Sequence, residues 1–370
     1  MYPKLKYNLK KLEHNINYLA KLVKKTDDFK LTIVTKSVAA DKEIARSIAS
    51  NPNVDYVGDS RMENIISNKQ FVEENGKESM LLRLPMISEV DRIVANADIS
   101  LNSEIVTIKA LNEEAKKQDK VHKVILMIDL GDLREGIFYE DKEKIMDVVK
   151  QILELSNIEL LGVGTNLTCY GGIIPTYENL QILCQVAKEI ESQFNIKLPI
   201  VSGGNSSSVY LVERNELPEG NNNLRLGESF LLCNDTANCE EIKGCVKDAI
   251  ICEVEIIELQ HKPSLPIGEV GLDALGNKPN HQDKGVIDRA ILAIGEQDTV
   301  CKRMYPVIKQ GEDYVDDPSI EVLGSSSDHM ILDVSKSKRK LKVGDTLEFR
   351  MDYAALLRLA TSPYVAKEYL

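Results

Sequence analysis

Lys36 is the residue of this chain whose type and position most clearly indicate covalent chemistry. It ends an apolar run that covers residues 31–36, as a lysine at the end of a buried strand would. Partial withdrawal from water disfavours the charged ammonium, so the neutral amine becomes available to attack a carbonyl carbon. Lys36 is therefore a candidate for forming a Schiff base.

A second group of residues could bind an anion. Residues 202–208 read Ser-Gly-Gly-Asn-Ser-Ser-Ser, and Gly227 follows a later apolar run. Glycines let the backbone approach an anion closely, and the hydroxyl of Ser206 can donate a hydrogen bond to it. The first segment alone could equally be a flexible loop. The two segments together favour a phosphate site.

The elements that must position these residues repeat along the first two thirds of the chain. Eight apolar runs alternate with helical patterns, which is typical of a (β/α)8 TIM barrel, and we predict one over residues 8–235. Asn8 is placed to cap the first helix. The apolar runs cover residues 31–36, 55–59, 80–85, 99–102, 124–130, 160–166, 198–202 and 224–232.

Polar residues close all eight runs, and in a barrel these ends meet at one rim, where such enzymes place their sites. Any one of them could simply mark the end of a strand. The eight together predict a shared pocket. They are Lys36, Asp59, Arg83, Asn102, Asp129, Asn166, Ser202 and Arg225.

After residue 235 the pattern changes to short alternating segments separated by Gly, Pro and Asp, which predicts a smaller all-β domain over residues 236–370. Residues 1–7 are expected to pack with it, and a helix is expected over residues 353–360. The expected strands cover residues 251–259, 289–294, 320–323, 330–334 and 346–350.

Composition excludes several classes of function. A net charge of −12 argues against a nucleic-acid surface. Seven cysteines without a CxxC pair, and five scattered histidines, indicate neither a disulfide framework nor a metal site. The first residues lack the apolar core of a secretion signal, and no apolar stretch is long enough for a membrane span. These features favour a cytoplasmic protein with reduced thiols.

Several segments in order along the chain resemble the fold-type III, alanine-racemase-like enzymes, most closely the branch of ornithine racemases and related amino-acid racemases. The cofactor of that family is pyridoxal 5′-phosphate. The matching segments are residues 34–38, 57–61, 128–136, 164–166, 205–206, 224–227 and 324–329.

The resemblance implies a role for each matching residue. Lys36 would bind the cofactor covalently, and Arg225 would face its pyridine nitrogen, where a guanidinium keeps its proton and leaves the nitrogen unprotonated. Quick reprotonation of the substrate would then be favoured over transamination. The remaining cofactor residues would be Asn166, Asn205, Ser206, Gly227 and Tyr364.

The substrate residues implied by the resemblance depart from those of alanine racemases. Arg134 aligns with an arginine near the substrate carboxylate, but Met127 stands where a modified lysine often supports that arginine. Asn166 stands where many relatives have a ring-facing histidine, and Ala40 replaces a phosphate-binding tyrosine. These changes point away from alanine, towards ornithine or another basic amino acid. Acids that could hold a distal ammonium, or be plain surface charges, are Asp132, Glu228 and Asp328.

Racemisation needs an acid or base opposite Lys36. The stretch over residues 268–276 lacks the tyrosine that alanine racemases use, so Asp273, by position, and His329, by its titration range, are the two candidates. The family also implies a homodimer. Two alternatives to a racemase remain, a non-catalytic protein that binds pyridoxal 5′-phosphate and an amino-acid decarboxylase.

Overall fold

The computed structural model describes residues 1–26, 28–273 and 275–370. The chain divides into two compact units. The barrel unit is Glu13–Cys245, and the β unit combines Met1–Leu12 with Val246–Leu370. The division falls after Cys245. The sequence predicts the boundary somewhat earlier, after residue 235.

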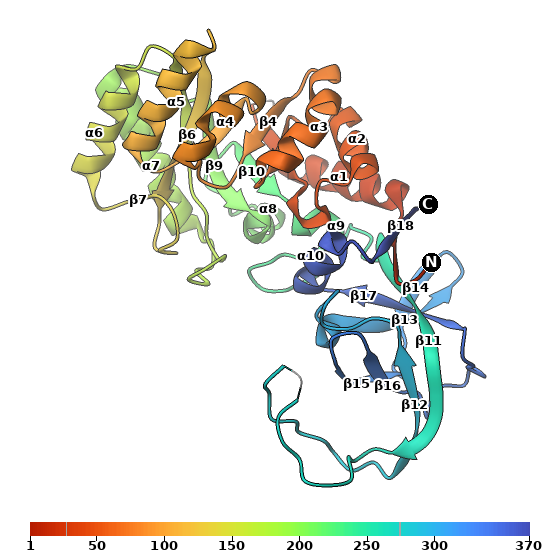
Figure 1. The fold of residues 1–370 in the computed structure, drawn as a ribbon. Helices are drawn as coiled ribbons and strands as arrows, with labels where there is room; N and C mark the ends of the chain where they lie inside the picture. Colours follow the sequence, from red (N-terminus) through yellow and green to blue (C-terminus); the bar gives the residue numbers. More distant parts are fainter. Residues whose placement is uncertain (27, 274) are drawn as a thin grey trace. The chain divides into compact units, whose positions relative to one another are not determined.

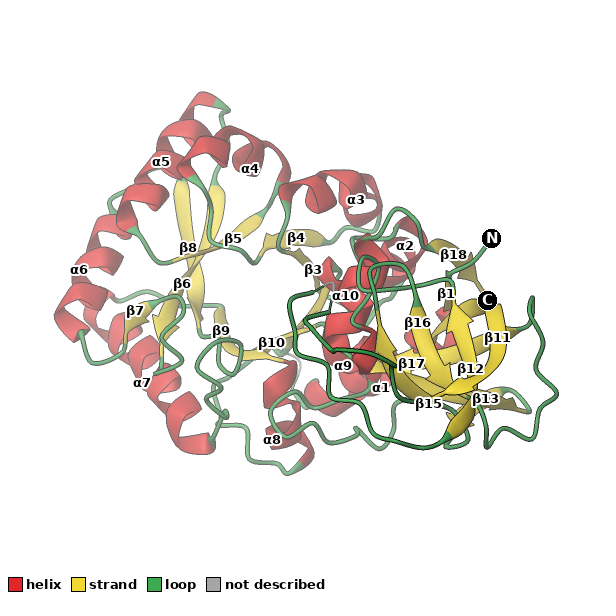
Figure 2. Ribbon diagram, turned by 60° about the horizontal axis from the view of Figure 1, so that its bottom comes forward, coloured by secondary structure: helices red, strands yellow, loops and turns green. Residues whose placement is uncertain are grey.

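The barrel unit contains a closed ring of eight parallel strands, which confirms the predicted (β/α)8 barrel (Figure 2). Neighbouring strands follow the order β5-β4-β3-β2-β10-β9-β8-β6, and pairing of β5 with β6 closes the ring. The two-residue strand β7 (Ile137–Phe138) pairs in parallel with the last residues of β6 and is not part of the ring. The ring strands are β2 (Lys30–Val34), β3 (Tyr56–Asp59), β4 (Glu78–Leu81), β5 (Ile99–Asn102), β6 (His122–Asp129), β8 (Ile158–Gly164), β9 (Ile200–Asn205) and β10 (Asn223–Leu226).

Helices connect these strands, and Figure 2 shows α3 to α7 outside the ring. Side chains cap several of them: Asp41 caps α2, Asp141 caps α6, and Thr176 forms a capping box with Asn179 on α7. Asn8 caps α1 (Leu9–Val23), as predicted. The other helices of this part are α2 (Lys42–Ser50), α3 (Met62–Glu74), α4 (Val90–Asn96), α5 (Ile105–Lys117), α6 (Lys142–Leu153), α7 (Tyr177–Phe194), α8 (Val209–Glu213) and α9 (Glu228–Leu232).

Apolar side chains fill the interior of the barrel. A buried cluster from β4, β5, β6, β8 and β9 includes Met80, Leu101 and Met127. A larger cluster packs the outer faces of the strands against the helices. Gly162 lets β8 approach β9, because a Cβ atom there would lie 1.8 Å from the carbonyl oxygen of Ile200.

Two expectations about the strands are wrong in detail. The apolar run over residues 224–232 is not one strand: β10 ends at Leu226, and after Gly227 the chain forms α9. A short buried helix and a buried strand are both continuous apolar runs, so the pattern alone does not separate them. Lys36 is not the last residue of a strand either, because β2 ends at Val34 and Lys36 begins the 3-10 turn Lys36–Val38.

The β unit is a mainly antiparallel sheet with one α-helix, α10 (Tyr353–Thr361), which confirms the predicted second fold class. Its strand order is β14-β13-β17-β11-β12-β16-β15, with the long β11 prominent in Figure 1, and β1 pairs with both β11 and β18. The strands are β1 (Lys4–Tyr7), β11 (Ile250–Pro263), β12 (Val286–Leu292), β13 (Met304–Gln310), β14 (Asp313–Asp316), β15 (Glu321–Ser325), β16 (Met330–Asp333), β17 (Thr346–Met351) and β18 (Ala366–Tyr369).

No described helix combines the length and the apolar character that crossing a membrane requires.

Candidate active site

A hydroxyl and two backbone amides converge at the carboxyl ends of β9 and β10. The buried Oγ of Ser206 accepts hydrogen bonds from the N–H of Gly227 at 3.3 Å and from the N–H of Ser229 at 3.2 Å. It also donates to the hydroxyl of Ser229 at 3.1 Å. Backbone N–H and hydroxyl donors gathered at one point are suited to an anion such as a phosphate.

Arg225 is a buried cation on β10, with only 4% of its surface exposed. Its Nη1 donates to the hydroxyl of Ser202, and its Nη2 donates to the carbonyl oxygen of Thr165 at 2.6 Å. Among the described residues no carboxylate forms an ion pair with it. Burial lowers the pKa of Arg225 to about 10, so the guanidinium still carries its charge at neutral pH. A buried charge with neutral partners is unfavourable for stability, which is typical of a functional group.

Two asparagines connect the ends of β8 and β9. The Nδ2 of Asn205 donates to the Oδ1 of Asn166 at 2.9 Å and to the carbonyl oxygen of Leu167 at 3.1 Å. The Nδ2 of Asn166 is buried and has no hydrogen-bond partner among the described residues. Since a buried donor is normally satisfied, this amide is available for a ligand.

Lys36 lies half-buried at the same rim, directly after β2. The residue before it, Thr35, is fixed to β3: its hydroxyl donates to the Oδ2 of Asp59 at 2.7 Å, and its N–H donates to the carbonyl oxygen of Gly58. Burial raises the pKa of Asp59. β2 is paired with β10, so Lys36 and Gly227 follow neighbouring strands.

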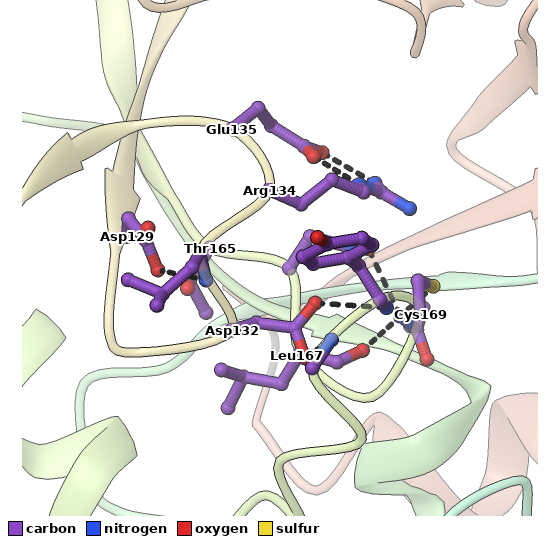
Figure 3. A network of polar contacts seen from close by, with 12 residues as sticks. Asp129, Asp132, Arg134, Glu135, Thr165, Leu167 and Cys169 are labelled. Carbon is purple, nitrogen blue, oxygen red and sulfur yellow. Dashed lines mark hydrogen bonds and ion pairs between the residues drawn. The ribbon is translucent and has the colours of Figure 1, made fainter.

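Arg134 lies on the loop that joins β6 to β7, and it forms a two-point ion pair with Glu135 (Figure 3). This bond raises the pKa of Arg134. The loop is held by Asp129, whose Oδ1 accepts from the N–H of Gly131 at 2.8 Å and of Leu133 at 3.1 Å. Gly136 is required at its end, because a Cβ atom would lie 2.5 Å from the backbone nitrogen of Asp129.

Asp132 connects this loop to the loop that follows β8. Its carboxylate is 1% exposed and accepts hydrogen bonds from the N–H groups of Tyr170, Gly171 and Ile173. Asp132 is therefore not a surface charge, and its hydrogen bonds to these N–H groups stabilise the backbone that follows Cys169 (Figure 3). Its role towards a substrate ammonium stays a prediction.

The structure brings together seven of the predicted site residues on the barrel rim: Lys36, Arg134, Asn166, Asn205, Ser206, Arg225 and Gly227. The other four belong to the β unit. Asp273 accepts from the N–H groups of Leu275 and Asn277, which lowers its pKa. Asp328 and His329 are exposed in the turn between β15 and β16, and Tyr364 is 61% exposed. Their roles stay predictions.

Sequence reasoning missed Ser229 and Glu135. Ser229 was not identified because the apolar pattern of residues 224–232 predicts one strand, in which a serine does not indicate a site. Glu135 was visible only as a charge beside Arg134. The alternation of apolar runs and helical patterns does not reveal which neighbour the side chain of a loop residue contacts.

No cluster of three or more histidine, cysteine, aspartate or glutamate side chains in the described part of the chain is arranged to hold a metal ion.

Comparison with known proteins agrees with the architecture. The model of the alanine racemase N-terminal domain matches residues 7–233. The chain is 49% identical to a protein named ornithine racemase from Acetoanaerobium sticklandii over 370 residues, which is all of both chains. It is 37% identical to a protein named lysine racemase from Thermotoga maritima over 369 residues, covering 100% of this chain and 99% of the other. An alanine racemase structure from Bartonella henselae with covalently bound pyridoxal phosphate covers 100% of both chains with a TM-score of 0.72 at 16% identity.

Proposed function

Because the chain belongs to the alanine racemase family, we propose that it is a pyridoxal 5′-phosphate-dependent racemase of basic amino acids, with ornithine as its preferred substrate. The full-length relatives named ornithine racemase and lysine racemase support this substrate class. The observation that carries the proposal is the convergence of Lys36, the Ser206 donor cluster and the buried Arg225 on one barrel rim.

The residues present fit pyridoxal 5′-phosphate. The donors at Ser206, Gly227 and Ser229 suit its phosphate. The unpartnered Nδ2 of Asn166 and the guanidinium of Arg225 supply buried donors for the ring, and Lys36 supplies the amine that binds the aldehyde. When bound, this cofactor withdraws electrons from the substrate Cα and makes its hydrogen acidic.

Lys36 would accept the Cα proton at its Nζ on one face of the substrate and return it in the opposite reaction. Arg225 would donate a hydrogen bond to the pyridine nitrogen. Its pKa of about 10 keeps the guanidinium protonated near neutral pH, so it does not hand a proton to that nitrogen. This restrains electron withdrawal and favours racemisation over transamination.

Arg134 would bind the substrate carboxylate, for which a guanidinium fork is suited. The group that holds the distal ammonium of ornithine stays a prediction, with Asp132, Glu228 and Asp328 as the candidates.

The acid or base opposite Lys36 also stays a prediction. The backbone donors of its own loop lower the pKa of Asp273, which makes this carboxyl group a poor proton donor at neutral pH. Asp273 and His329 both remain candidates for the role. A homodimer in the cytoplasm is part of the same proposal, and it is supported by family membership.

The proposal is tested by incubating the purified protein and pyridoxal 5′-phosphate with L-ornithine, L-lysine or L-alanine. Chiral chromatography should detect D-ornithine at the highest rate, while the total amount of amino acid stays constant. Bound cofactor without racemisation of any amino acid would instead indicate a carrier protein. Release of carbon dioxide with formation of a diamine would indicate a decarboxylase.

A further inference from the structure

Arg134 and Glu135 form a charged pair on the barrel rim beside the residues proposed for the cofactor. The carboxylate of Glu135 contacts both Nε and Nη2 of Arg134, and its side chain is only 11% exposed. The loop that carries the pair is fixed at Asp129 on one side and through Asp132 on the other. The hydrogen bonds of Asp129 and Asp132 therefore hold the loop that carries the pair.

Position 127 offers no charged partner to Arg134. Met127, two residues before Asp129, is fully buried in the apolar interior of the barrel. Among the described residues, Glu135 is the one carboxylate that forms an ion pair with Arg134. The orientation of the guanidinium thus depends on its neighbour in sequence.

Glu135 also acts on the second cation of the rim. Arg225 has no carboxylate in ion-pair distance among the described residues, and the negative charge of Glu135 is the largest electrostatic influence that stabilises its protonated form.

We propose that Glu135 is a positioning residue: it orients the Arg134 guanidinium towards the α-carboxylate of the amino-acid substrate. This inference rests on the proposed racemase function. Glu135 itself touches neither the substrate nor the cofactor in this role.

The test compares Glu135→Gln with the wild-type holoenzyme and with Glu140→Gln. The control replaces an exposed glutamate of the same segment, which accepts a hydrogen bond from the hydroxyl of Tyr139. Two ligands distinguish the contribution of the carboxylate to binding from that of the rest of the substrate. They are ornithine and 1,4-diaminobutane, which is ornithine without its carboxylate. The KM for ornithine and the inhibition constant of the diamine are measured for each protein.

Glu135→Gln should raise the KM for ornithine about tenfold, because one charged hydrogen-bond pair is lost, and change kcat much less. The inhibition constant of the diamine should stay at its wild-type value. In Glu140→Gln, both the KM for ornithine and the inhibition constant of the diamine should stay at their wild-type values. Glu135→Asp, which keeps the charge on a shorter side chain, should lie between the wild type and Glu135→Gln. If Glu135→Gln fails to fold, the comparison of Glu135→Asp with the control decides.

A lower or unchanged KM for ornithine would overturn the inference, since it would mean that Glu135 competes with the substrate for Arg134 or is irrelevant to it. An equal loss for ornithine and the diamine would also overturn it, because the effect would then not concern the carboxylate. Absence of racemisation in the wild-type protein would contradict the proposed function instead, so the two failures are distinguishable.

Discussion

Replacement of Asp132 is expected to destabilise the loop that follows β8 more than any single exposed substitution. Its buried carboxylate accepts from the N–H groups of Gly171 and Ile173 at Oδ1, at 3.0 and 3.3 Å, and from Tyr170 at Oδ2, at 3.1 Å. Hydrogen bonds to charged groups contribute roughly 1.5–3 kcal/mol each, and these are fairly long, so Asp132→Ala should lower the free energy of unfolding by about 4 kcal/mol.

Asp132→Asn should have a smaller effect. The amide oxygen can keep the two bonds made by Oδ1, but the NH₂ group then faces the N–H of Tyr170, so the expected loss is about 2 kcal/mol. Urea unfolding gives both values. Hydrogen exchange of the amides of Tyr170, Gly171 and Ile173 shows whether the loss is local.

Asp147→Ala provides the matched control, because Asp147 is exposed and accepts a hydrogen bond from the side chain of Gln151. It should change the free energy of unfolding by less than about 0.5 kcal/mol. If Asp132→Ala were as mild as this control, or if the loop amides kept their protection, the assigned role of Asp132 would be refuted.

Three further outcomes are expected. Lys36→Ala should abolish both the visible absorbance of the bound cofactor and turnover, and a labelled lysine elsewhere after borohydride reduction would contradict this. Ser206→Ala should raise the dissociation constant of the cofactor about tenfold in equilibrium dialysis, since one phosphate donor is lost; an unchanged constant would speak against the donor cluster. Burial lowers the pKa of His122 to about 4, so the unfolded chain binds this proton near pH 6.5 and the folded one does not. Stability should therefore fall by about 2 kcal/mol from pH 7 to pH 5, and less in His122→Gln, as measured by urea unfolding at both values.

The barrel could be predicted from the sequence because its signal is repeated. Apolar runs of strand length returned eight times, each closed by a polar residue, and the helical patterns between them had the right spacing. The residues that lie at strand ends, such as Lys36, Asn166 and Arg225, could be proposed for the same reason: the end of a strand in a barrel has one location. The family resemblance is confirmed by the match to the alanine racemase N-terminal domain.

Contacts made within loops could not be predicted. Asp132 and Glu135 belong to the same short segment, yet one is a buried acceptor for a neighbouring loop and the other binds its adjacent arginine. Both residues are acidic and lie close together in the sequence, so the sequence does not distinguish their roles. The path of the backbone decides which contacts each of them makes. Strands β14 and β18 were missed because their sequences, DYVD and AKEY, are polar; pairing with neighbours makes them strands, not an apolar pattern.

Strand β1 has a consequence for biosynthesis. It forms ladders with β11 and β18, and both of these strands are translated after the barrel. While the intervening barrel is being translated, β1 in the nascent chain has neither partner and presents open backbone groups. Its four residues include Lys4 and Lys6, and such short, positively charged edges resist pairing with foreign strands. Lys4 and Lys6 are therefore expected to disfavour pairing of β1 with other strands until β11 and β18 have been translated.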